Sequence, residues 1–292
     1  MLSHRDVYFL FKSCAVQHDS PKLYMLVDYA GIPGLVKKLT QANLEWTSLF
    51  ERSKEESALS VAPVLFQITM DERGIQHRIL IDWVCEHGTY SSSMIFLVSP
   101  LPMPELARRL MTRLDAVLSE DIEVLLRFFD PRIFEQLMVV LSIKEKQEFL
   151  CIAHECWFPD RRGNLQKVRA LFSEVDIYSS PMTLNSAQED ALLDASEQDQ
   201  VAALLLSGIP ESYLNLSLPK RSDFIVRHME AAKLLGISST HELALYCALP
   251  FFYGEDFSEE QQWKIVLEKV KLKMVDLKQA AEEVEKTIIE KG

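Results

Sequence analysis

The stretch VLLRFFDPRIFEQLM, residues 124–138, joins a short apolar run to the start of a helix. Asp130 is a residue type favoured at the N-cap, and Pro131 is favoured at the first helical position. The apolar residues that follow Pro131 recur at helical spacing. The stretch therefore predicts a strand that leads into a helix, with Asp130 as the helix cap.

The same alternation of strand and helix continues towards the N-terminus. Apolar runs typical of buried strands lie at residues 23–27, 62–69, 94–98 and 123–128. Helical patterns lie at residues 3–16, 33–41, 79–86 and 104–118, and Gly88 is expected to end the third of them. These elements predict an N-terminal α/β lobe with a mixed, partly parallel sheet that is covered on both faces.

The pattern changes in the second half of the chain. The turn residues 159–163 predict a small hairpin within residues 157–169, and residues 179–181 have the composition of a linker. Helical patterns then occupy residues 186–207, 221–235, 239–252 and 258 to the C-terminus. We expect an α/β domain at residues 1–178 and an all-helical lobe with a long C-terminal helix at residues 179–292.

Composition excludes several classes of protein. The chain has 292 residues and a formal net charge of -12, which argues against nucleic acid as a partner, because phosphate binding favours a basic surface. Five scattered cysteines do not predict a disulfide framework. A membrane span needs about 20 apolar residues, and the best run, residues 243–253, is shorter and contains Pro250. With no signal-peptide pattern at residues 1–14, we expect a soluble, cytoplasmic protein without a membrane span.

Metal and cofactor motifs are sparse. Cys151, His154 and Cys156 form a C-x-x-H-x-C pattern, which lacks the C-x-x-C pair typical of zinc sites. The glycine-bearing turn at residues 31–34 matches neither G-x-G-x-x-G nor a phosphate-binding loop. We therefore expect no metal and no cofactor.

Two carboxylates follow predicted strands and are the candidates for catalysis. Asp28 and Asp130, together with Arg127, could form the acid–base centre of a hydrolase. Alternatively, Arg127 and Arg132 form ion pairs with Asp28 or Asp130, and the residues have a structural role. The structural interpretation is favoured, because caps at strand–helix junctions are common. The catalytic interpretation requires these side chains to converge on an open pocket.

The C-terminal helix carries a heptad stripe. Its apolar residues alternate at spacings of four and three: Trp263, Leu267, Val270, Met274, Leu277, Ala281, Val284 and Ile288. We expect one helix from about residue 258 into residues 282–283, with this stripe buried either on its own lobe or against a partner helix. The candidates for partner binding are Leu277, Val284 and Ile288, and the aromatic residues Phe251, Phe252 and Tyr253.

Four segments together resemble the effector adaptors, or effector chaperones, of bacterial type VI secretion, called Tap or Tec proteins. The segments are LYMLVDYAGIPGLVKKL (23–39), SLFERSKEESALSVAPVLFQI (48–68), SSSMIFLVSPLPMPELARRL (91–110) and VLLRFFDPRIFEQLM (124–138). The matching residues include Asp28, Leu49, Phe50, Ala62, Pro63, Ser99, Pro100, Arg127, Asp130, Pro131 and Arg132. A weaker similarity covers residues 220–268. There, Gln262 replaces the proline that usually precedes the tryptophan, and the heptad stripe extends beyond the end of many members.

The resemblance implies a non-enzymatic adaptor of the bacterial cytoplasm. Members of this family bind a secreted toxin effector and deliver it to the VgrG spike protein. The composition agrees with this function but does not by itself indicate it. We therefore expect an effector adaptor, with a hydrolase that uses Asp28, Asp130 and Arg127 as the alternative.

Overall fold

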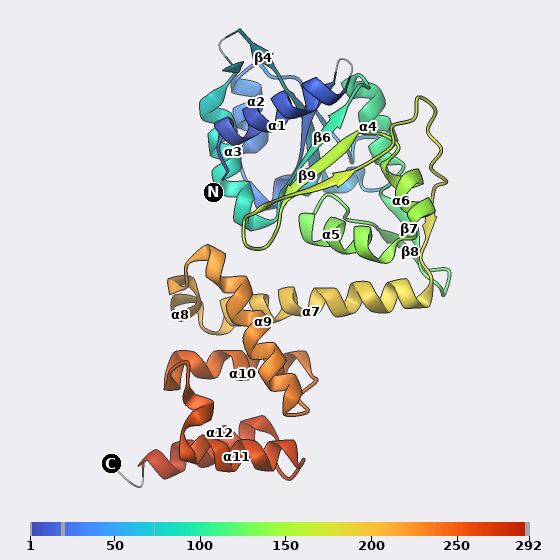
Figure 1. Ribbon diagram of the computed structural model, residues 1–292. Helices are drawn as coiled ribbons and strands as arrows, with labels where there is room; N and C mark the ends of the chain where they lie inside the picture. The colour runs from blue at the N-terminus through green and yellow to red at the C-terminus, as the bar shows by residue number, and fades with distance from the viewer. Residues whose placement is uncertain (1, 19–20, 73, 290–292) are drawn as a thin grey trace. The chain divides into compact units, whose positions relative to one another are not determined.

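The computed structural model describes residues 2–18, 21–72 and 74–289 (Figure 1). The chain divides into two compact units, Met1–Leu192 and Leu193–Gly292. An α/β unit is thus followed by a helical unit, as the sequence predicts. The division falls C-terminal to the expected boundary at residues 178/179.

The main sheet of the first unit has six strands in the order β10-β9-β6-β1-β3-β2. Their bounds are β1 (Lys22–Asp28), β2 (Trp46–Ser48), β3 (Pro63–Ile68), β6 (Met94–Ser99), β9 (Glu155–Pro159) and β10 (Leu165–Arg169). The pairings within this sheet are antiparallel. β9 and β10 form the hairpin predicted around residues 159–163.

The mixed sheet is a smaller one. It contains β7 (Asp115–Val117), β8 (Glu123–Leu125) and β11 (Met182–Thr183), and β11 pairs with β7 in parallel. The prediction of a mixed, partly parallel sheet therefore holds for this sheet, whereas the main sheet is antiparallel. The apolar strands indicated burial on both faces, and burial does not determine the direction of a neighbouring strand.

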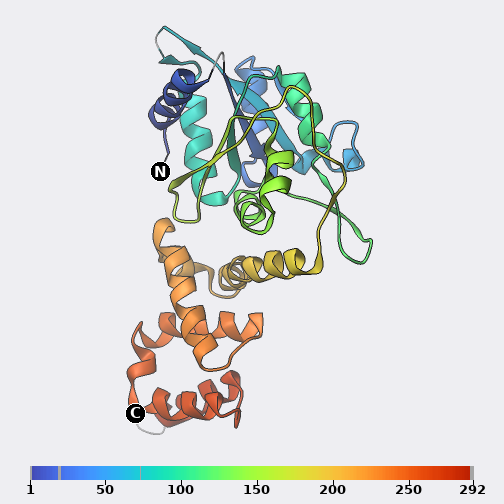
Figure 2. The same cartoon turned by 45° about the vertical axis from the view of Figure 1, so that its right-hand side comes forward.

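Helices cover both faces of the main sheet (Figures 1 and 2). Along β1, Leu23, Met25 and Val27 face one core and Tyr24 and Leu26 face the other, as the two-residue period of a strand requires. The first core includes residues of α1 (His4–Gln17), α2 (Leu35–Gln41) and α3 (Arg78–Ser91). The second includes residues of α4 (Met103–Met111), α5 (Pro131–Val140) and α6 (Ile143–Leu150).

The predicted end of a helix at Gly88 is wrong, because α3 continues through this residue to Ser91. A Cβ atom at Gly88 would lie 2.9 Å from Met94 Sδ and 3.1 Å from Ile32 Cδ1. Gly88 therefore allows α3 to pack closely against its neighbours and does not stop it.

Two buried arginines bind the segment between β10 and α7. Arg109 lies in α4, and Arg113 lies in the turn after it. Arg109 donates to the carbonyl oxygens of Ser173, at 3.0 Å, and of Glu174. Arg113 Nη2 donates to Asp176 Oδ1 at 2.8 Å. Residues 179–181, predicted to be a linker between lobes, lead directly into β11, so this part of the chain belongs to the first unit.

The second unit is helical. Its helices are α7 (Ser186–Gly208), which begins in the first unit, α8 (Pro210–Asn215), α9 (Leu218–Leu234), α10 (Thr240–Tyr253), α11 (Gln261–Lys271) and α12 (Leu277–Ile289). Trp263 is fully buried in its core. None of the helices within the described residues is long and apolar enough to cross a membrane.

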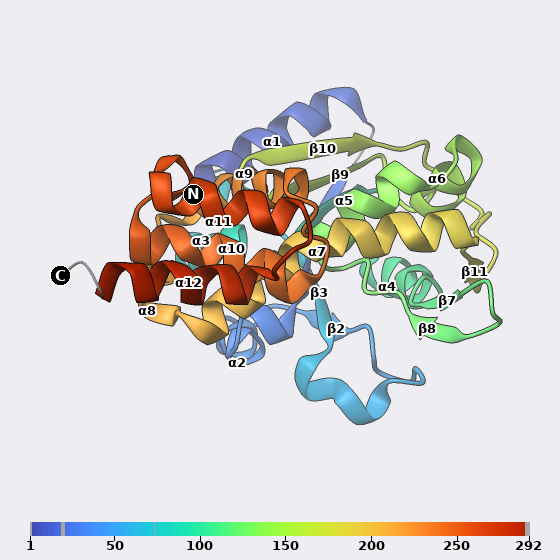
Figure 3. The ribbon, with the colours of Figure 1, turned by 90° about the horizontal axis from the view of Figure 1, so that it is seen from below.

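The prediction of one continuous C-terminal helix is wrong. α11 ends in a Schellman turn, in which Lys273 has φ 55° and the Met274 amide donates to the Lys269 carbonyl oxygen at 2.9 Å. α12 then begins after Asp276, whose Oδ1 accepts from the Gln279 amide at 2.7 Å. α11 and α12 lie side by side (Figure 3). The stripe is therefore divided between two helices that pack on each other.

Candidate functional site

Asp28 lies at the end of β1 and is 5% exposed. Its Oδ1 accepts a hydrogen bond from the Ala30 amide at 3.1 Å, which begins the short 3₁₀ turn Tyr29–Gly31. Its Oδ2 accepts from Arg127 Nη2 at 2.8 Å. Asp28 therefore ties the end of β1 to the segment that precedes α5.

Asp130 is the N-cap of α5, which confirms the prediction from the sequence. Asp130 Oδ1 accepts from the Arg132 amide at 2.9 Å, and Oδ2 accepts from Arg132 Nη2 at 2.6 Å. Pro131 occupies the first turn, where its missing N–H costs no helical hydrogen bond. The predicted ion pairs exist, and each acid has its own arginine.

These contacts favour a structural role for both carboxylates. A general acid or base must reach a substrate proton in an accessible site. Asp28 and Asp130 are instead buried, and each already accepts from a backbone amide and a guanidinium. A hydrolase would need both side chains turned towards an open pocket.

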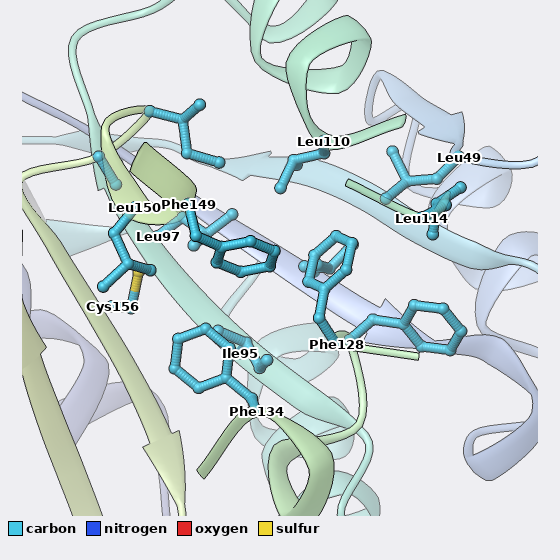
Figure 4. Packing of buried hydrophobic residues seen from close by; sticks show 14 of the residues in the cluster. Leu49, Ile95, Leu97, Leu110, Leu114, Phe128, Phe134, Phe149, Leu150 and Cys156 are labelled. Carbon is cyan, nitrogen blue, oxygen red and sulfur yellow. The ribbon is translucent and has the colours of Figure 1, made fainter. Parts of the chain in front are cut away.

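Aromatic side chains on both sides of Asp130 pack into the core of the first unit (Figure 4). Phe128 packs edge-on against Phe149 with ring centroids 5.5 Å apart, and Phe134 packs edge-on against Phe158 at 5.3 Å. These residues are buried in the core between the sheet and α5 and α6. Residues 124–138 thus supply both the N-cap of α5 and its contacts with the core.

The cysteine and histidine residues of the C-x-x-H-x-C pattern have different environments. Cys151 Sγ donates to Asp176 Oδ1 at 3.3 Å, whereas the His154 ring stacks on His18 with centroids 4.1 Å apart. Burial raises the pKa of the Cys156 thiol to about 12, so this residue is held as a neutral thiol. Within the described residues, no group of three or more histidine, cysteine or acidic side chains is arranged to hold a metal ion.

Glu155 is a buried charge that the sequence patterns did not indicate. It is 1% exposed, and its carboxylate accepts from Trp157 Nε1 at 2.9 Å and from the Cys14 thiol at 3.1 Å. Lys167 Nζ lies 2.6 Å from Glu155 Oε1. Burial opposes the charged form, but these donors together lower the pKa of Glu155 below its ordinary value. The network joins α1 to the β9–β10 hairpin.

The partner-binding candidates of the second unit are not equivalent. Leu277 is fully buried and Val284 is 1% exposed, so this part of the stripe is buried within its own unit, the first of the two alternatives given above. They are buried because α12 packs on α11 and α10. The side chain of Ile288 lies outside the described residues.

The aromatic triplet is partly accessible. Phe252 is 64% exposed, whereas Phe251 packs on Phe224 with centroids 5.0 Å apart. Tyr253 packs edge-on against Trp263, and its hydroxyl lies 3.2 Å from Glu285 Oε1. Of the three, Phe252 alone is left with most of its side-chain surface exposed.

A concave surface on the first unit was not predicted from the sequence. A cavity of about 880 Å³ is bounded by α2, the β4 (Met70–Asp71)–β5 (Gly74–Ile75) hairpin and the first turns of α3. Lys38, Ile79 and Trp83 are among its lining residues. A second cavity of about 480 Å³ lies between the same hairpin and α1, and it is lined in part by Arg5 and Phe9. Both cavities include Ile75 and Arg78. We call this pair of cavities the hairpin groove.

Comparison with known proteins gives a family match for part of the chain. Residues 23–148 match the family model described as Domain of unknown function (DUF4123). Neither the curated proteins nor the solved structures contain a significant match. The matched residues include both acid–arginine junctions and the larger cavity of the hairpin groove. α1, the segment fastened by Arg109 and Arg113, and the helical unit lie outside the match.

Proposed function

We propose that this protein is a non-enzymatic adaptor of the bacterial cytoplasm that binds a type VI secretion effector and helps to load it onto the VgrG spike. The observation that carries the proposal is the match of residues 23–148 to the DUF4123 family model. The four segments that resemble type VI effector adaptors lie within these residues.

The environment of the motif residues supports an adaptor over the hydrolase alternative. Asp28 and Asp130 are buried and engaged in caps and ion pairs, so the motif stabilises the junction between β1 and α5. An adaptor requires accessible binding surfaces and no reactive groups. The hairpin groove and the exposed Phe252 provide such surfaces.

Deletion of the gene in its native bacterium tests this function. The proteins secreted by the deletion strain should lack one effector that the parent strain secretes, and the wild-type chain supplied in trans should restore it. The type VI apparatus should still assemble and secrete its other proteins. An unchanged set of secreted proteins would contradict the proposal.

A variant separates adaptor from enzyme. Arg127→Lys keeps a cation beside Asp28 but changes the guanidinium geometry that a catalytic centre would use. If the protein is an adaptor, this variant should restore effector secretion as long as it folds. A folded Arg127→Lys protein that fails to complement would favour the catalytic alternative.

A further inference from the structure

We propose that the hairpin groove binds an extended or helical segment of a partner protein in which apolar side chains stand next to carboxylates. This inference rests on the proposed adaptor function, because it names the surface and the chemistry by which a partner is held. The argument depends on the shape of the groove, its exposed apolar residues and its charge.

The shape accommodates a segment of polypeptide. Cavities of about 880 and 480 Å³ lie on either side of the β4–β5 hairpin and have Ile75 and Arg78 in common. Ligand sites in proteins commonly have volumes of this order. Ile75 is buried and Arg78 is exposed, so a segment that crosses the Arg78 side chain would reach both cavities.

Each cavity contains an apolar side chain that is exposed in the free protein. Ile79, in the larger cavity, is 87% exposed, and Phe9, in the smaller, is 68% exposed. Trp83 adds an aromatic surface that is only partly buried. Covering these groups removes apolar surface from water, which favours association with a partner that has apolar side chains of its own.

The charge of the groove specifies the partner further. Arg5, Lys38 and Arg78 contribute positive charge, and Asp71 and Glu72 contribute negative charge, within a chain whose formal net charge is -12. The described lining of the groove therefore carries one more positive than negative side chain, on a protein that is acidic as a whole. Such a surface attracts carboxylates, whereas the net negative charge of the whole chain disfavours association with a second copy.

Two details place this charge where a carboxylate could meet it. Lys38 Nζ lies 4.6 Å from the centroid of the Trp83 ring, so the ammonium is held next to an apolar surface. His77, the N-cap of α3, has φ 53° and provides no side-chain cap, and it lines the same cavity. The positive end of the 14-residue helix α3 thus adds to the field of Lys38.

The test uses the full chain and three synthetic peptides of equal length labelled with a fluorophore. One peptide alternates leucine and glutamate, one alternates leucine and lysine, and one alternates serine and glutamate. Fluorescence anisotropy measures binding at low and at high salt. The leucine–glutamate peptide should bind at least about tenfold more tightly than either of the others, and high salt should weaken its binding, because the exposed charges are screened.

Matched variants locate the binding. Ile79→Glu and Lys38→Glu should each weaken binding of the leucine–glutamate peptide by about fivefold or more, because each replaces an attractive contact with a repulsive one. Ile143→Glu and Lys37→Glu are the controls: Ile143 is 80% exposed outside the groove, and Lys37 is the exposed neighbour of Lys38 that does not line it. All four positions are exposed, so folding should be retained, and circular dichroism checks it.

The inference is wrong if the leucine–glutamate peptide binds no better than the other two, or if the groove variants weaken binding no more than their controls. It is also wrong if the wild-type chain self-associates and Ile79→Glu abolishes this, because the occupant is then a second copy.

Copurification from the native cell separates this inference from the adaptor function. A secreted effector that still copurifies with an Ile79→Glu, Lys38→Glu double variant would refute the groove and leave the adaptor function intact. Absence of any effector with the wild-type chain would refute the adaptor function.

Discussion

Replacing Asp130 with alanine tests whether the DPR motif is structural. The change removes the hydrogen bond to the Arg132 amide, which caps α5, and the ion pair with the Arg132 guanidinium. Loss of a cap costs about 0.5–2 kcal/mol. The Arg132 side chain is 37% exposed, so its ion pair is screened by solvent and adds about 0.2–1 kcal/mol.

The expected loss is therefore about 1–3 kcal/mol in the free energy of unfolding. A loss of 2 kcal/mol corresponds to a fall of about 6 °C in the Tm of a unit of this size. Urea denaturation followed by tryptophan fluorescence measures it, and the m-value should not change. Asp130→Asn, which keeps an oxygen for the cap but loses the charge, should lie between wild type and Asp130→Ala.

Glu86→Ala, at an exposed position of α3, is the control and should change stability by less than about 0.5 kcal/mol. The structural interpretation would be refuted by an Asp130→Ala protein that unfolds at the wild-type urea concentration but no longer supports effector secretion. That result would show that Asp130 has a functional role and does not serve mainly to stabilise the fold.

Three further outcomes test the packing within the first and the second unit. Arg113→Met should cost about 3–5 kcal/mol in a urea titration, because Asp176 loses the fully buried guanidinium that pairs with it. Burial alone would raise the pKa of Asp176, but hydrogen bonds from Arg113 lower it overall. The ion pair therefore stabilises the folded protein at neutral pH, and this stabilisation is lost as the pH falls through the lowered pKa. In Arg113→Met, the free energy of unfolding should not show this loss at acidic pH. In the second unit, Val284→Asp should unfold the helical core or lower its Tm by more than 10 °C, roughly what a buried unpaired charge costs, whereas Met274→Asp, at a residue 69% exposed, should leave the Tm within about 2 °C.

Local patterns predicted much of the fold. Asp130 and Pro131 marked the start of α5 because capping depends on residues adjacent in the chain. The apolar strands predicted a sheet buried on both faces, and the two cores on β1 confirm this. Strand direction depends on which segments meet in space, which explains why the antiparallel order of the main sheet did not follow from the pattern.

The C-terminal stripe shows where periodicity misled. The spacing of the apolar residues continues through Met274, so it predicted one helix, yet the chain turns at Lys273. The local signal was Asp276, three residues before Gln279, which is a helix-start pair. Two short helices share the stripe, and α12 packs against α11 with Val270, Leu277 and Val284 buried, which supplies the tertiary packing that a helix needs to be stable in water.

The hairpin groove could not be predicted from sequence. Its lining comes from α1, α2, the β4–β5 hairpin and α3, which are brought together only by the folded sheet. Ile79 is the first apolar residue of the helical pattern at residues 79–86, but it lies in the first turn of α3 and is exposed. Asp28 and Asp130, by contrast, were recognised from the sequence as possible catalytic residues, and the structure shows them in caps and ion pairs.

Purification of the tagged chain from its native bacterium, followed by mass spectrometry, tests the central claim most directly. The account predicts that a type VI effector copurifies in near-stoichiometric amount, that VgrG is recovered when the effector is present, and that an untagged strain yields neither. A chain recovered alone from cells that are actively secreting by this system would contradict the account.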